Sequence, residues 1–214
     1  MSKYTGLKLR NVPDKRRCIR RSRPGNRIYM SEILGKTVES SRPGQHRQSV
    51  VSRKISDSRV QLFEKQKLQF NYGLNEKQLS RLVKEARKSK IAAGEKLAEL
   101  IERRLDNVVF RSGFAHSIPA ARQLVNHGHI QVNERRVDIA SHRVSVGDVI
   151  GPKLKSQNLP VIKEAVISLR LARPDWLECN YMESRATMIG NPGLESLSVK
   201  VEIARVIEYY AKRG

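Results

Sequence analysis

Excess positive charge is the feature that most limits how this chain can fold. Its 214 residues include 42 Lys and Arg but only 21 Asp and Glu, which leaves a formal net charge of +21. Repulsion of this size opposes a compact state unless a polyanion neutralises part of the charge. The sequence therefore predicts an intracellular protein that binds a polyanion, with nucleic acid as the first partner to test.

The charge is concentrated near the N-terminus. The first 60 residues hold sixteen basic and four acidic side chains, whereas the other 154 hold twenty-six and seventeen. Residues 1–45 show no sustained periodicity, so we predict a basic N-terminal extension there. A solvated tail is one interpretation, and an arm that becomes ordered on RNA phosphates is the favoured one because the remainder is also basic. The arm's expected contacts are Arg16, Arg17, Arg20 and Arg21.

Several classes of protein are excluded by composition. The longest segment without a charged side chain is 123–133, far shorter than the ~18 apolar residues of a membrane helix. The start of the chain lacks the apolar core of a signal peptide. Only Cys18 and Cys179 are present, which indicates a reducing compartment and no disulfide scaffold. We expect no membrane association, no metal and no cofactor.

Apolar residues recur at helical spacing over three segments, 60–70, 79–86 and 97–109, and Gly73 and Gly113 end the first and third. Ser117 is a suitable N-cap for a short helix through Val125, and Gly128 can take the left-handed position that ends it. Helical spacing returns at 199–210. We expect this last helix to pack on the earlier ones, because alone it could not bury its apolar face.

Between these helices, apolar and polar residues alternate with a period of two. The segments 129–132, 136–139, 143–146 and 149–150 alternate and predict short antiparallel strands, with a turn at Asn133-Glu134. The segment 161–169 is expected to continue the sheet. The predicted fold is α+β, with an N-terminal extension at 1–45 and a helical domain at 46–94 that residues 195–214 complete. A helix and antiparallel-sheet RNA-binding module with its following strands then occupies 95–194.

Basic side chains accompany the helices and strands of this module. Guanidinium groups bind phosphates with two parallel hydrogen bonds, while neutral His, Asn and Gln can bond to phosphate or ribose oxygens. Such a surface recognises the shape of folded RNA more than its sequence. We expect Arg122 to project from the module, so that its removal weakens RNA binding without moving the thermal midpoint. The predicted RNA-binding residues here are Arg103, Arg104, Arg111, His116, Arg122, Gln123, His127, Asn133, Arg135 and Arg136.

This stretch resembles the RNA-binding module of the small-subunit ribosomal protein S4 family. The resemblance extends over residues 42–210, through Arg42-Pro43-Gly44-Gln45-His46, Glu64-Lys65-Gln66-Lys67, Tyr72-Gly73-Leu74 and Pro174-Asp175-Trp176-Leu177-Glu178. It implies a structural component of the small ribosomal subunit that binds ribosomal RNA early, at a junction in the 5′ domain. It also implies His46 and Arg47 as contacts, neighbouring ribosomal proteins as partners, a place beside the messenger-RNA entry channel, and sometimes repression of its own message.

The chain departs from this family in four ways. Cys18 stands alone where many relatives have four zinc-binding cysteines, and Arg47 follows His46 where a Gly is common. Asn133-Glu134 replaces an Asn-Gly turn, and Ala120 replaces an acidic residue. An RNA-modifying enzyme is one alternative, but no Gly-x-Gly, Walker-type loop or His-Glu pair is present. A stress factor that binds stalled subunits is another, and the helical domain argues against it. A bacterial cytoplasmic ribosome is favoured by the lack of a transit peptide, and an organellar one stays open.

Overall fold

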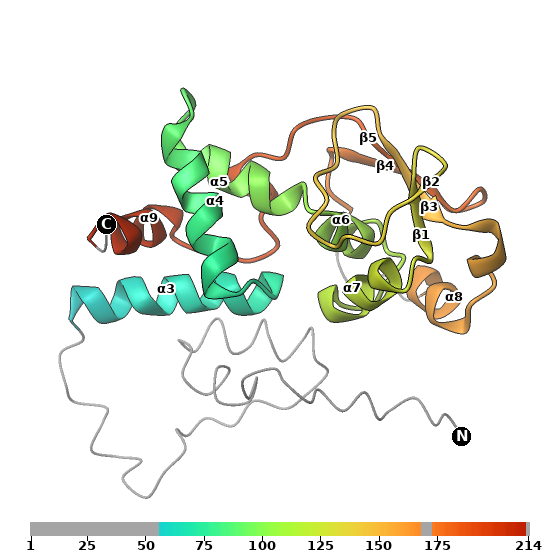
Figure 1. The fold of residues 1–214 in the computed structure, drawn as a ribbon, viewed down its shortest axis with the longest axis horizontal. Helices are drawn as coiled ribbons and strands as arrows, with labels where there is room; N and C mark the ends of the chain where they lie inside the picture. Colours follow the sequence, from blue (N-terminus) through green and yellow to red (C-terminus); the bar gives the residue numbers. More distant parts are fainter. Residues whose placement is uncertain (1–55, 168–172, 213–214) are drawn as a thin grey trace, which may run out of the picture. The chain divides into compact units, whose positions relative to one another are not determined.

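The computed structural model describes residues 56–167 and 173–212 (Figure 1). From Asp57 onward the described residues form one compact unit of helices and a five-stranded antiparallel sheet, which confirms the α+β prediction. The boundaries of the three predicted parts stay predictions. Among the described residues, none of the helices is long and apolar enough to cross a bilayer.

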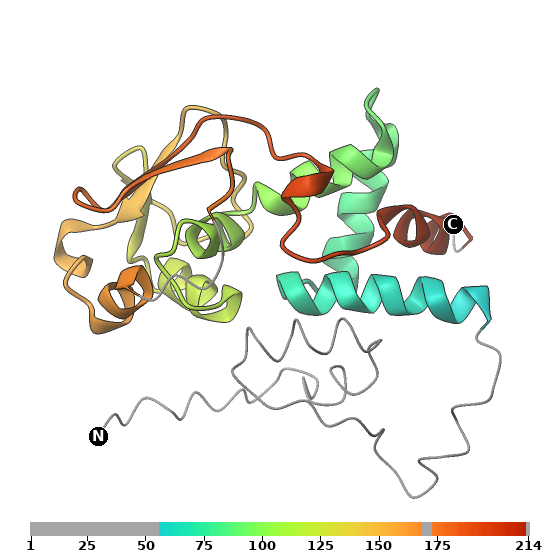
Figure 2. The ribbon, with the colours of Figure 1, turned by 180° about the vertical axis from the view of Figure 1, so that it is seen from behind.

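Four helices lie at one end of this unit. They are α3 (Asp57–Tyr72), α4 (Glu76–Lys88), α5 (Ala93–Glu102) and the C-terminal α9 (Ile203–Ala211). Gly73 has a φ of +61°, which ends α3 as the sequence predicts. Asn75 then starts α4, because its side chain accepts a hydrogen bond from the Gln78 amide while Gln78 bonds back to the Asn75 amide. Helix α9 packs on α3 and α5, as expected (Figure 2).

The predicted helix at 97–109 is wrong, because the chain forms two helices there. Helix α5 ends at Glu102 and α6 (Leu105–Arg111) begins after Arg104, whose backbone is extended with ψ of 135°. The loop after β2 takes the backbone groups at this break: the Leu105 amide bonds to the His142 carbonyl at 2.8 Å, and the Val144 amide to the Arg103 carbonyl at 2.9 Å. Tertiary pairing therefore overrides local helical periodicity.

The sheet has the strand order β2-β1-β3-β5-β4. Its strands are β1 (Ile130–Val132), β2 (Arg135–Arg136), β3 (Val149–Pro152), β4 (Leu177–Asn180) and β5 (Arg185–Met188). The expected strand at 143–146 forms only one bridge, between Arg143 and Arg104. The hairpin of β4 and β5 was not predicted. Its four-residue strands are too short, and too rich in polar groups, to give a clear alternation.

The expected strand at 161–169 is also wrong. Residues Pro160–Ile167 form helix α8, with Ile162 and Ala165 buried at a helical spacing of three. Pro160 suits the first position of a helix because that position needs no amide hydrogen bond. A short apolar run of this kind fits either a strand or a helix, so its period alone does not decide.

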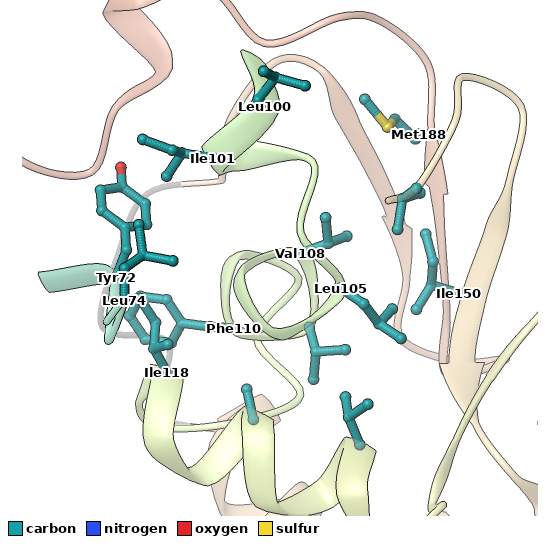
Figure 3. Packing of buried hydrophobic residues seen from close by; sticks show 14 of the residues in the cluster. Tyr72, Leu74, Leu100, Ile101, Leu105, Val108, Phe110, Ile118, Ile150 and Met188 are labelled. Carbon is teal, nitrogen blue, oxygen red and sulfur yellow. The ribbon is translucent and has the colours of Figure 1, made fainter. Parts of the chain in front are cut away.

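One hydrophobic core joins the four-helix end to the sheet. In Figure 3, Leu105 and Val108 of α6 face Ile150 and Met188 of the sheet, while Tyr72 and Leu74 lie beside Phe110 and Ile118 on the other side. Trp176 and Tyr209 are buried as well. Helix α6 is therefore the element through which both ends share a core.

A buried polar cluster lies beside this core. Glu102 is fully buried and accepts hydrogen bonds from the Tyr72 hydroxyl and from Asn107 Nδ2, the latter at 2.6 Å. The Arg111 Nε lies 3.7 Å from the same carboxylate. Burial raises the pKa of Glu102 above its ordinary value of 4.5, and the Arg111 charge and the two hydrogen bonds only partly oppose this.

The raised pKa makes stability depend on pH. Because the folded chain binds this proton more tightly than the unfolded chain, the contribution of Glu102 is complete below pH 4.5 and is lost as pH rises through the raised pKa. In urea unfolding from pH 4 to 8, wild type should lose stability relative to Glu102→Gln as pH rises. A difference that is constant with pH, as for the exposed control Glu178→Gln, would contradict this.

Candidate nucleic-acid interface

Helix α7 and the hairpin that follows it carry most of the predicted site. The prediction that Ser117 caps α7 (Ile118–Asn126) is confirmed, since its side chain accepts from the Ala120 amide. Gly128 has a φ of +70° and turns the chain from α7 into β1, also as predicted. The N-cap Ser117 and the left-handed Gly128 thus determine where α7 begins and where the chain turns into β1, and so where His127 lies.

The turn between β1 and β2 depends on Asn133. Both Asn133 and Glu134 have positive φ, 49° and 65°, which is the two-residue turn that matches the twist of a hairpin. The Asn133 amide group donates to Asp148 at 2.7 Å and accepts from the Val149 amide at 2.9 Å. This side chain therefore fixes the hairpin onto β3, and its predicted RNA contact stays a prediction.

Arg136 closes over the end of α7. It pairs with Gln131 across the hairpin, and its guanidinium lies against Gly128. A Cβ atom at position 128 would come within 2.4 Å of Arg136 Nε, so any larger residue there would displace the guanidinium from this place. The side chain is 58% exposed, and the carboxylate of Asp138 is 3.9 Å away. Arg136 is therefore open to an anion.

Arg122 does not project freely, which corrects our expectation. Its Nε donates to Asp106 Oδ2 at 3.0 Å, and its Nη2 contacts the same oxygen. Its Nη1 donates to the Gly73 carbonyl at 2.8 Å, where α3 ends. The side chain is 30% exposed against 1% for Asp106. Arg122 thus ties α7 to α6 and to the four-helix end, and RNA contact by its exposed part stays a prediction.

Three other arginines that we predicted to bind RNA also form hydrogen bonds or ion pairs within the protein. Arg103 donates to the Val144 carbonyl at 2.8 Å and to Glu99 at 2.6 Å. Arg104 is buried and bonds to Asp106, and Arg111 bonds to the Ser196 carbonyl and neighbours Glu102. These arginines position the module. The sequence could not separate them from surface arginines, because their partners lie up to 85 residues away.

The remaining predicted residues fall into two groups. Gln123, His127 and Arg135 are exposed on α7 and the hairpin with Arg136, and half-buried His116 lies just before α7. Arg16, Arg17, Arg20, Arg21, His46 and Arg47 lie outside the described residues. Of this exposed set, Arg135 and Arg136 lie on β2 at the end of the sheet, and Arg136 also lies against Gly128 just after α7. RNA contact by the set stays a prediction.

A basic stripe on α4 was not among the predicted sites. Its four members share one face of the helix and are all exposed: Lys77, Arg81, Lys84 and Lys88. Their spacing of four, three and four is the signal that could have found them. The opposite face carries Leu79, Leu82, Val83 and Ala86, which are buried. None of the four basic side chains makes an ion pair within the part of the chain that the structure describes.

A metal site has little support in this surface. The described residues contain no group of three or more His, Cys, Asp and Glu side chains close enough to hold an ion. The rings of His127 and His129 are 6.1 Å apart, but His129 Nδ1 is 3.0 Å from the Ser156 hydroxyl. Cys179 is half-buried, and burial raises its pKa, which disfavours the metal-binding thiolate.

The purified protein should therefore contain no bound zinc. Elemental analysis after dialysis against a chelator is expected to give less than 0.1 zinc per chain, and the melting temperature should be the same with and without the chelator. The reason is that a zinc site of four thiolates cannot be built from two cysteines. One zinc per chain that survives dialysis would refute this prediction.

The contacts of Arg122 generate a stability prediction. Replacing Arg122 with Ala should destabilise the protein by about 2 kcal/mol, since hydrogen bonds to charged groups contribute about 1.5–3 kcal/mol. For a chain of this size that lowers the melting temperature by roughly 4–8 °C. Arg122→Lys should recover only part of this, because one ammonium cannot reach both Asp106 and Gly73. The exposed control Arg135→Ala should melt like wild type, and equal melting of Arg122→Ala would contradict the prediction.

Comparisons with known proteins agree with this geometry. Residues 103–150 match the S4 domain, and residues 11–102 match the Ribosomal protein S4/S9 N-terminal domain. The chain is 45% identical to the small ribosomal subunit protein uS4 of Methylobacillus flagellatus, over the full length of both. It is 42% identical to uS4B of Nitrosomonas europaea and 40% to uS4 of Synechococcus elongatus, again over the full lengths. The chain therefore belongs to the bacterial-type ribosomal protein S4 family.

Proposed function

We propose that this protein is a structural component of the small ribosomal subunit that binds ribosomal RNA. The observation that carries this is the exposed edge at β2, where Arg135 and Arg136 lie beside the end of α7 on a module that internal arginines hold in place. The full-length similarity to proteins named small ribosomal subunit protein uS4 supports the same function. Its place is then the ribosome of a bacterial cytoplasm.

Shape recognition requires that the phosphate-binding groups keep fixed positions. Arg122 ties α7 to the end of α3, and Arg143 of the loop after β2 forms two hydrogen bonds of 2.6 Å to Glu85 of α4. These contacts join the β2 edge to the helix that carries the α4 stripe. A folded RNA with phosphates at matching positions would bind both surfaces at once, whereas a plain duplex would meet one.

The α4 stripe suits a nucleic-acid backbone. Residues 77 to 88 extend about 16 Å along the helix at 1.5 Å per residue. Four cations over that length can each approach a different phosphate and release condensed counterions. Because these side chains are exposed and make no ion pair among the described residues, no internal contact has to break before they bind RNA.

The finer parts of the proposal come from the family resemblance. We infer early binding at a junction in the 5′ domain, contact with neighbouring ribosomal proteins, a place beside the messenger-RNA entry channel, and repression of its own message in some species. The enzyme alternative is excluded, because members of this ribosomal family are structural. The stress-factor alternative is disfavoured by the match of residues 11–102 to a ribosomal domain.

The test is a salt titration of the full chain with a small-subunit 5′-domain transcript. The affinity should fall steeply with salt, by about 0.7–0.9 in log–log slope for each phosphate neutralised. Replacing the four α4 residues with Gln should reduce that slope by about 2–3 units, and Arg135→Ala with Arg136→Ala by about 1–2. The exposed controls Lys163→Gln and Lys200→Gln should leave the slope unchanged.

Selectivity is measured in the same titrations with a length-matched RNA duplex. Wild type should bind the transcript at least tenfold more tightly than the duplex. Equal affinity for both RNAs would show that the protein binds charge alone and would overturn the proposed recognition of shape. Slopes that the α4 and β2 substitutions leave unaltered would place the RNA on another surface.

A further inference from the structure

A groove crosses the face of the sheet that the core helices leave uncovered. Its volume is about 920 Å³, and a smaller hollow of about 270 Å³ continues it toward the β1–β2 turn. Gln131 of β1 and Arg185 of β5 line both hollows. Their strand neighbours Ile130, Ile150 and Ala186 are buried, so Gln131 and Arg185 lie on the opposite side of the sheet from the core.

Two highly exposed apolar side chains line this groove. Leu154 belongs to the short 3-10 helix η1 (Leu154–Ser156), and Met182 to the loop between β4 and β5. They are 80% and 96% exposed, more than the other large apolar side chains of the described residues except Ile167. Figures 1 and 2 both show these two segments at the edge of the sheet away from α3 and α4. Large apolar side chains exposed to this degree in one hollow indicate a surface that a partner covers.

A glycine lines the smaller hollow and sets how closely the β4–β5 loop approaches β3. Gly151 is buried in β3, and a Cβ atom there would come within 2.6 Å of the Ser184 carbonyl. The β4–β5 loop can therefore lie close over β3 only because position 151 has no side chain. The packing of the β4–β5 loop on β3 therefore positions Met182 at the groove. The groove is already formed in the protein without a partner.

The charges in the groove favour a protein over RNA. Lys153, Lys155 and Arg185 line it together with two carboxylates, Glu134 and Glu183. Arg185 is 55% exposed and only loosely paired, at 3.9 Å from Glu183. Single-stranded RNA binds on aromatic rings, and no lining residue is aromatic. Leu154 and Met182 suit apolar side chains, which a phosphate backbone does not offer.

We propose that this groove binds an extended segment of another protein that carries alternating apolar and acidic side chains. Apolar groups would cover Leu154 and Met182, and carboxylates would pair with Lys153, Lys155 and Arg185. Crossing from the first to the third of three strands about 4.8 Å apart needs about three residues of extended chain at 3.3 Å each. The proposal rests on the proposed function in one respect, because the segment's source is taken to be a neighbouring ribosomal protein.

The first test places a photoreactive group in the groove of the full chain within assembled small subunits. Met182→p-benzoylphenylalanine should cross-link to a protein segment that mass spectrometry shows to contain both acidic and apolar residues. The matched control Ile91→p-benzoylphenylalanine, 51% exposed in the α4–α5 loop, should not cross-link to that segment. Cross-linking of position 182 to RNA, to a basic segment or to nothing would overturn the proposal.

The second test separates this groove from RNA binding. The cross-linked segment, made as a labelled peptide, should bind the full chain at least tenfold more weakly after Leu154→Ser with Met182→Ser, while Ile91→Ser changes binding less than twofold. Neither set should alter affinity for the 5′-domain transcript. A parallel loss of RNA affinity in the groove variant would make the groove an RNA surface and overturn the proposal. Failure of wild type to bind the transcript would instead contradict the proposed function alone.

Discussion

Two buried carboxylates, one at the end of α5 and one at the start of α6, hold this protein together. Asp106 and Glu102 are 1% and 0% exposed, and between them they engage Arg104, Arg111 and Arg122. In a chain of net charge +21, arginines packed inside the fold would repel one another without such partners. Removing either acid would leave buried guanidinium groups uncompensated, which costs more than the loss of any one exposed pair.

This arrangement divides the basic residues into two kinds. Arginines that bond to Asp106, Glu102, Glu99 or main-chain carbonyls set the angle between the four-helix end and the module. Lysines and arginines on α4 and β2 stay exposed. A protein that recognises the shape of RNA needs both, because exposed cations discriminate between shapes only if they are held at fixed separations.

Local signals in the sequence predicted much of the fold. Ser117 and Gly128 bound α7 because capping and a left-handed turn depend on single residues, and the buried faces of α4 and α9 follow from their apolar spacing. The buried face of α3 does not, because it includes Gln61, Glu64 and Lys65. The break at Arg103-Arg104 could not be predicted, since it depends on pairing with a loop some forty residues later. Likewise, the sequence showed where arginines cluster, but not that Arg122 donates its hydrogen bonds to Asp106 and Gly73. Both the helix break and the contacts of Arg122 depend on partners far away in the sequence.

The short strand β2 has a consequence for the protein before it meets RNA. It is an edge strand of two residues, and both are arginines that stay exposed. Adjacent residues in a strand point to opposite faces, so Arg135 and Arg136 surround the edge with charge. An unpaired sheet edge is a template on which other chains add strands and aggregate, and charged, very short edge strands prevent this. The two side chains that we assign to RNA would therefore also keep newly made copies of the protein from sticking to one another.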